Sequence, residues 1–233
     1  MNKIRLMLCL VCMLLTVSCA TDLPTKFEKK LAVLERKSLA LMTIEYVNEF
    51  REDWEGPIPL AFLLGEDGDD RVMHDLGGRH LRALSQNREF YLFVNEADKG
   101  DYFFYSIRGE IHGKPLGRFG GYKSFWEAPV LLNYQVKENE IVYIGNVRLI
   151  LRKKTSDSEI KAAPGIIPDF REGSMSQATF DIQISDRYER DVNEFEKVFN
   201  LKGHNVVKRI LPSWKRPSSQ EFQTKKTNLF FIR

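Results

Sequence analysis

Short runs of apolar, β-branched and aromatic residues alternate with clusters of Gly, Asp and Asn from residue 38 onward. The clearest run is QATFDIQIS at 177–185, where apolar and polar residues alternate as in a strand with one buried face. Further strands are predicted at 39–47, 58–65, 88–96, 101–113, 128–140 and 140–154. About seven strands separated by turn signals predict a mainly β fold, specifically an antiparallel β-sandwich.

Two local signals refine this pattern. Residues 137–140, Lys-Glu-Asn-Glu, join two predicted strands and indicate a tight turn. Gly145 stands inside the run VYIGNVRLI, and a glycine within a strand usually marks a β-bulge or a close approach of another backbone. We therefore expect the strand at 140–154 to be irregular near Gly145.

One C-terminal amphipathic helix is predicted at 187–200. Asp186 can cap its N-terminus, and Glu189 follows at the spacing of a capping box. Apolar residues recur along one face of this helix, namely Tyr188, Val192, Phe195 and Phe199. We expect this face to pack on the sandwich.

The segment after Pro212 is expected to form a basic C-terminal tail, 213–233. Residues 205–233 have a net charge of +6, and Pro217 breaks regular structure. The final NLFFIR, 228–233, is apolar enough to add an edge strand or to pack against the domain. The tail is interpreted either as a solvated segment or as a contact for an anionic envelope polymer or lipid headgroups.

The N-terminal residues have the pattern of a signal peptide. Lys3 and Arg5 precede an uncharged apolar stretch at 6–17. Those twelve residues would make a helix of about 18 Å, too short for the roughly 30 Å hydrocarbon core of a bilayer. A signal sequence therefore fits better than a membrane-spanning helix.

Residues Thr16-Val17-Ser18-Cys19 resemble the bacterial lipobox, in which small residues precede a cysteine that becomes the lipidated N-terminus. The resemblance implies that Cys19 carries acyl chains, and two or more such chains anchor a protein stably in a membrane. Ala20, rather than Asp, follows the cysteine, which by the same resemblance implies the outer membrane with the protein facing the periplasm. The alternative is an ordinary signal peptide in which Cys19 is incidental.

These boundaries divide the chain into a signal peptide at 1–18, a polar tether at 19–37, a β-sandwich domain at 38–212 and the basic tail at 213–233. Processing would remove two basic residues and no acidic one, so the net charge would fall from +3 to +1. Cys19 would be the last cysteine, which excludes disulfides, cysteine nucleophiles and cysteine-based zinc sites. The mild charge argues against a nucleic-acid binder.

The segment 113–127 is the candidate ligand loop. It combines four glycines with Arg118, Tyr122, Phe125 and Trp126. Exposed aromatic side chains on a loop can stack on sugars or pack against a partner. The alternative is that these aromatic residues fold back into the core.

No catalytic residue, metal site or cofactor is predicted. His74 and His80 lie six residues apart but do not match a zinc motif. The acidic run at 66–70 fails the EF-hand pattern and suits a hairpin turn better. The chain contains no nucleophile elbow, zinc-protease motif or dinucleotide-binding motif.

The body of the chain also resembles a class of uncharacterised bacterial lipoproteins. The resemblance spans about 128–200 and is carried by Tyr143-Ile144-Gly145-Asn146, Asp186, Tyr188 and Asp191. It implies a β-sandwich similar to transthyretin or to a carboxypeptidase regulatory domain, and it transfers no catalytic residue.

The leading hypothesis is a non-enzymatic envelope lipoprotein. It would be held in the membrane through the acyl chains of Cys19 and would bind an envelope protein or an anionic polymer. The alternative is an envelope hydrolase whose acidic or histidine side chains converge only in three dimensions.

Overall fold

The structure is a computed structural model of the whole chain. It describes residues 38–51, 58–66, 74–75, 80–82, 90–112, 123–162, 175–198, 201 and 203–230. The predicted signal peptide, Cys19 and the tether lie outside the described residues.

The described chain is mainly β-strand, as predicted, with two α-helices. The strands are β1 (Ser38–Asn48), β2 (Ile58–Glu66), β3 (His74–Asp75), β4 (His80–Arg82), β5 (Phe90–Ala97), β6 (Gly100–His112), β7 (Lys123–Val136), β8 (Ile141–Lys153), β9 (Ala178–Ser185) and β10 (Val206–Lys208). The helices are α3 (Tyr188–Val198) and α4 (Ser219–Phe230), and a short 3-10 turn spans Met175–Gln177. Each of the seven predicted strands has a counterpart, whereas β3, β4 and β10 are too short to leave a periodic pattern.

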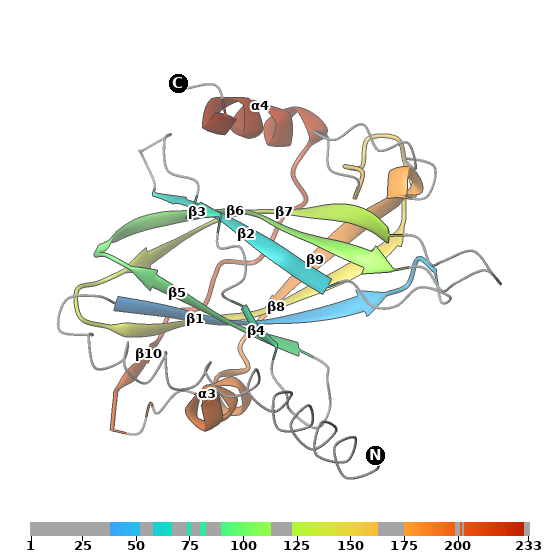
Figure 1. Cartoon of the computed structure of the whole chain (residues 1–233). Coiled ribbons are helices and arrows are strands. Elements are labelled where there is room, and N and C mark those ends of the chain that lie inside the picture. The colour runs from blue at the N-terminus through green and yellow to red at the C-terminus, as the bar shows by residue number, and fades with distance from the viewer. Residues whose placement is uncertain are drawn as a thin grey trace, which may run out of the picture.

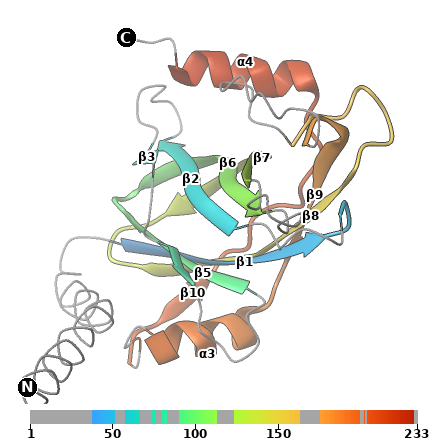
Figure 2. The same ribbon diagram turned by 45° about the vertical axis from the view of Figure 1, so that its right-hand side comes forward.

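The strands form two sheets that lie as two layers (Figure 1). One sheet has the order β3-β2-β6-β7, and the other has the order β10-β8-β1-β5-β4 with β9 also beside β8. Helix α3 lies outside the second sheet and α4 outside the first, as Figures 1 and 2 both show. The main apolar core fills the space between the layers, where the rings of Phe93 and Phe104 stack with centroids 6.5 Å apart.

The expectation of a wholly antiparallel arrangement is wrong for the centre of the larger sheet. Most described strand pairs are antiparallel, but β8 runs parallel to both β1 and β10. The reason is topological: the chain returns from β2 and β3 as β5, antiparallel to β1, and then passes through β6 and β7 of the other sheet before it returns on the opposite side of β1 as the parallel β8. Alternation of apolar residues reports which face is buried and says nothing about the direction of the neighbouring strand.

The predicted irregularity at Gly145 is confirmed as a β-bulge. Leu41 is opposite Tyr143 while the next residue, Met42, is opposite Gly145, so Ile144 is the extra residue. Side chains alternate between faces along a regular strand, and one extra residue reverses that alternation. The bulge therefore places both Tyr143 and Asn146 on the sheet face that carries α3.

The C-terminal strap, residues 209–218, connects the two layers (Figure 1). It runs on from β10, where the backbone N–H of Leu211 donates to the carbonyl of Ile144, 2.8 Å away. Leu211 is buried in the main core, and Trp214 Nε1 donates to the carbonyl of Pro129 on β7, 3.1 Å away. The strap thus bonds to β8 of one sheet and to β7, the edge strand of the other, before α4 begins.

Helix α4 replaces the irregular end that the sequence predicts. Its Phe222 is buried and stacks on Tyr105 of β6, with ring centroids 5.2 Å apart. Residues 228–230, expected to add an edge strand, instead form the last turn of α4, and 231–233 lie outside the described residues. Ser218 caps the helix, since its Oγ accepts the N–H of Glu221 at 3.1 Å. Ser218 is a helix-start signal, but the sequence predicts irregular structure here because of the nearby prolines.

Substitution of Gly145 by Ala should destabilise the domain. Gly145 has a φ of +116°, and a Cβ there would lie 3.3 Å from Ile210 Cγ2 and 3.4 Å from the carbonyl of Ser185. We expect a loss of about 2 kcal/mol or more in the free energy of unfolding, measured by chemical denaturation. Gly100→Ala is the matched control, because the nearest atom to its added Cβ is 3.6 Å away. An equal loss in both variants would contradict the assignment of strain to the bulge.

Candidate functional site

The site begins with the N-terminus of α3, where the predicted cap is present. The carboxylate of Asp186 accepts the backbone N–H of Tyr188 at 3.0 Å and the ammonium of Lys208 at 2.8 Å. The hydrogen bond from Lys208, followed by that from the backbone, lowers the pKa of Asp186. The helix is therefore held to β10 at its first turn as well as by its apolar face.

The apolar face of α3 packs on the sheet as predicted. Phe195 is fully buried, and Tyr188 and Val192 pack against the same cluster. The hydroxyl of Tyr188 donates to the carbonyl of Val206 at 2.7 Å. Phe199, the fourth residue of the predicted face, lies outside the described residues.

The centre of the site is Asp191, a carboxylate with no exposure to solvent. Its Oδ2 accepts hydrogen bonds from Thr43 Oγ1 and from the hydroxyl of Tyr143, each at 2.5 Å. Its Oδ1 accepts Arg190 Nε and Nη2, each at 2.7 Å. A buried carboxylate is tolerated only when it is paired and hydrogen-bonded, and these donors meet that requirement.

A chain of hydrogen bonds leads from Asp191 toward the surface. Asn146 Nδ2 donates to Thr43 Oγ1 at 2.9 Å, and Ser185 Oγ donates to Asn146 Oδ1 at 3.2 Å. Arg190 Nη1 donates to Glu45 Oε1 at 2.6 Å. Thr43 can make both of its bonds with one proton, since its hydroxyl accepts from Asn146 and donates to Asp191. We call these residues, from β1, β8, β9 and α3, the Asp191 network.

The surroundings of Tyr143 favour the protonated form of its hydroxyl. Burial, and then the hydrogen bond to Asp191, raise the pKa of Tyr143. Its hydroxyl therefore stays protonated and remains a donor throughout the neutral range. Because Asp191, Thr43 and Asn146 are buried, this part of the network can orient α3 on the sheet, while Arg190 and Glu45 at its outer end are partly exposed.

A second polar cluster binds the C-terminal strap to the far end of β8 and β9. Arg152 donates to Glu159 at 2.6 Å and to Asp181 at 2.5 Å, and Arg216 of the strap also pairs with Asp181. The hydrogen bond from Arg152 leads the causes that lower the pKa of Glu159 to about 2. Arg216 Nη1 also donates to Thr179 Oγ1 at 2.8 Å. All these charges are satisfied within the cluster.

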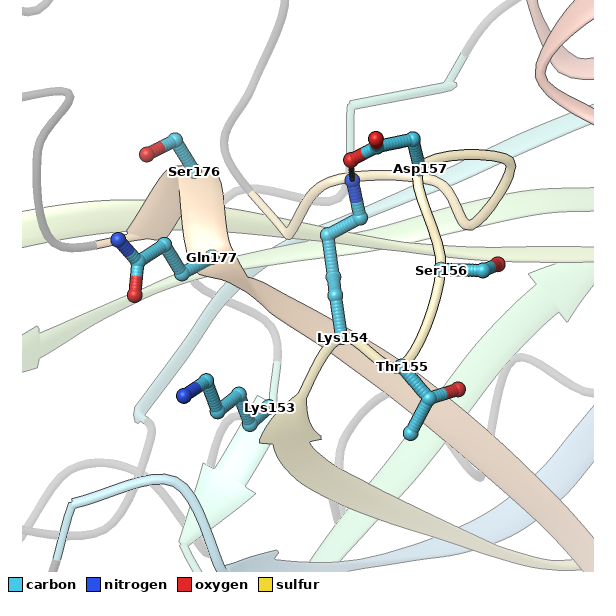
Figure 3. A pocket seen from close by; sticks show the side chains of 7 residues that line it. All are labelled: Lys153, Lys154, Thr155, Ser156, Asp157, Ser176 and Gln177. Carbon is cyan, nitrogen blue, oxygen red and sulfur yellow. Dashed lines mark ion pairs between the residues drawn. The ribbon is translucent and has the colours of Figure 1, made fainter.

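A polar hollow of about 320 Å³ lies beside this cluster, at the end of β8 (Figure 3). Its lining residues come from the end of β8 with the following turn and from the 3-10 turn before β9, namely Lys153, Lys154, Thr155, Ser156, Asp157, Ser176 and Gln177. We call it the β8 hollow. It has no apolar side chain among its lining residues, so it suits a polar or charged ligand.

The candidate ligand loop is divided by the structure. Phe125 and Trp126 lie within β7, where successive side chains point to opposite faces. Trp126 is buried in the main core, 5.1 Å from Phe180 between ring centroids, whereas Phe125 is 39% exposed. Arg118 and Tyr122 lie outside the described residues. For Trp126, the alternative interpretation is therefore correct, because its side chain packs in the core.

The histidine pair singled out in the sequence is divided between the sheets. His74 is in β3 and His80 is in β4, which belong to different sheets. Among the described residues, no group of three or more His, Cys, Asp or Glu side chains could hold a metal ion. No helix within that part of the chain has the length and apolar character needed to cross a bilayer.

Comparison of the chain with protein-family models, curated proteins and solved structures finds no match. The resemblance of 128–200 to bacterial lipoproteins therefore stays a prediction. Its quoted residues nevertheless share a location, because Tyr143, Asn146 and Asp191 all belong to the Asp191 network. The periodicity of the sequence does not identify Asp191 as buried. The buried face of the helix is predicted from its apolar residues, and an aspartate is expected to be exposed.

Two tyrosine substitutions should have opposite consequences for stability. Tyr143→Phe removes a donor to the buried carboxylate, and we expect the free energy of unfolding to fall by about 1–3 kcal/mol. Tyr46→Phe removes a buried hydroxyl that has no partner among the described residues, so stability should be retained or rise. Chemical denaturation of both variants measures the difference. A Tyr46→Phe loss as large as that of Tyr143→Phe would refute this assignment.

Proposed function

We propose that this protein is a lipid-anchored, non-enzymatic module of the bacterial cell envelope that binds an envelope component. The observation that carries the proposal is the sequence at 16–19, where small residues precede Cys19 directly after a charged and then apolar N-terminal region. The implied acyl chains on Cys19 would hold the module at the membrane. Ala20 favours the outer membrane, with the module facing the periplasm.

The distance between anchor and fold supports a tethered module. The first described strand begins at Ser38, so residues 19–37 separate Cys19 from the body. A chain of that length reaches at most about 65 Å when fully extended. This reach would let the body contact components near the membrane surface while the acyl chains stay inserted.

The arrangement of the body supports a binding or structural role. Two sheets with their core between them suit a β-sandwich, the finer fold class that we propose for the domain. The inner members of the Asp191 network are buried and hydrogen-bonded to one another, as expected of groups that hold a scaffold rigid. Rigid sandwiches commonly present binding surfaces at their ends and loops.

Substitution of Cys19 by Ala should release the protein from membranes. The thiol is the attachment point for lipid in this proposal, so its loss removes the acyl chains that hold the protein at the membrane. Membrane fractionation and labelling with radioactive palmitate would measure the effect in wild type and variant. Cys9→Ala, which changes a cysteine upstream of the cleavage point, is the matched control and should leave labelling unchanged. A wild-type protein that takes up no palmitate would refute the anchor.

Crosslinking in the intact envelope should capture a specific partner of the anchored body. A photoreactive residue placed at exposed Phe125 samples one face of β7, and one placed at exposed Lys161 samples the neighbouring segment, in which the carbonyl of Ala162 accepts the backbone N–H of Glu127. We expect adducts that disappear when the Cys19→Ala protein is released from the membrane. Turnover of an envelope substrate by the purified protein would instead indicate an enzyme.

A further inference from the structure

The β8 hollow is lined by two lysines, Lys153 and Lys154. Neither Lys153 nor Lys154 donates a side-chain hydrogen bond within the described part of the structure. Lys154 pairs only with Asp157, at 3.9 Å, which is beyond hydrogen-bonding distance. Figure 3 shows the Lys154 side chain extending toward Asp157, with Ser176 and Gln177 across the hollow from Thr155 and Ser156.

The burial of Lys154 makes its position informative. Its side chain is only 13% exposed, whereas that of Asp157 is fully exposed. A solvated carboxylate at this distance compensates a partly buried ammonium weakly, because water screens the exposed partner. The ammonium therefore keeps most of its charge available inside the hollow.

Two carboxylates near the hollow, those of Glu159 and Asp181, are already paired with arginines. Glu159 accepts Arg152 and the backbone N–H of Thr155, and Asp181 accepts Arg152 and Arg216. The two arginines thus neutralise Glu159 and Asp181, which leaves Asp157 as the carboxylate that lines the hollow. Among the described residues, the one carboxylate paired with either lysine is that of Asp157, 3.9 Å from Lys154.

We propose that the β8 hollow binds a compact phosphate group. Lys153 and Lys154 would supply the positive charge, and the hydroxyl and amide groups of Thr155, Ser156, Ser176 and Gln177 would supply neutral donors. A tetrahedral phosphate presents several acceptor oxygens, so it can use donors from both walls of the hollow at once. This inference deepens the proposed binding function by naming the chemistry of the ligand, which is either a phospholipid headgroup or a soluble phosphate ester.

The test uses the full chain purified in neutral detergent micelles. Inorganic phosphate is titrated at low ionic strength, and binding is followed by calorimetry and by the NMR shifts of the protein. We expect saturable binding that weakens as salt is added. Lys154→Met should weaken binding by roughly tenfold or more, because a charge-assisted contact is lost.

Lys161→Met is the matched control, because Lys161 is an exposed lysine of the same segment that does not line the hollow. It should leave phosphate binding unchanged, and a thermal melt of each variant checks that both are folded. Lys153→Met provides a second test should Lys154→Met unfold. Absence of saturable phosphate binding in the wild type, or an equal loss in the Lys161 control, would overturn the inference.

A second arm identifies the source of the phosphate. Micelles doped with phosphatidylglycerol are compared with micelles doped with phosphatidylcholine, whose headgroup has no net charge. Competition with inorganic phosphate by phosphatidylglycerol alone would assign the site to a lipid headgroup, and no competition would assign it to a soluble phosphate ester. The two proposals can fail separately. If crosslinking captures an envelope partner but the protein does not bind phosphate, the phosphate site in the β8 hollow is overturned and the proposed function is retained.

Discussion

The buried carboxylate of Asp191 is the constraint on which the arrangement of α3, β1 and β8 depends. A charge removed from water costs several kcal/mol unless donors replace the lost solvent. Thr43, Tyr143 and Arg190 replace it from two strands and from the helix itself. The helix can therefore occupy one position on the sheet, since a shift of one turn would leave the carboxylate buried without donors.

That requirement extends to the backbone of β8. Tyr143 and Asn146 reach the same side of the sheet only because the bulge at Gly145 inserts an extra residue between them. The bulge exposes the carbonyl of Ile144, which the strap uses through Leu211. The bulge thus positions the Asp191 network and also supplies a hydrogen-bond acceptor for the C-terminal strap.

The distribution of polar groups separates those that hold the fold from those available to a ligand. The carboxylates at the far end of β8 and β9 are paired with Arg152 and Arg216, which fasten the strap. Lys153 and Lys154, adjacent to Arg152, form no ion pair with Glu159 or Asp181 in the described structure, and Lys154 pairs with Asp157 at 3.9 Å. The described residues contain no cluster that could hold a metal ion. Charged side chains that are not strongly paired within the fold are therefore the best indication of where a ligand could bind.

The sequence by itself determined the seven long strands, the tight turn, the bulge at Gly145 and the amphipathic helix with its cap at Asp186. Each is encoded within a few neighbouring residues, by alternation, by spacing or by glycine. The proposed role of Cys19 also comes from sequence alone, because it rests on a contiguous motif.

Only the tertiary structure decided which groups meet. The parallel pairing of β1 with β8, the burial of Asp191, the core position of Trp126 and the helical end of the chain all depend on segments far apart in sequence. The β8 hollow joins residues from 153–157 with residues from 176–177, so no local pattern could predict it. Periodicity reports whether a residue is buried, whereas the identity of its neighbour is set by the packing of the whole chain.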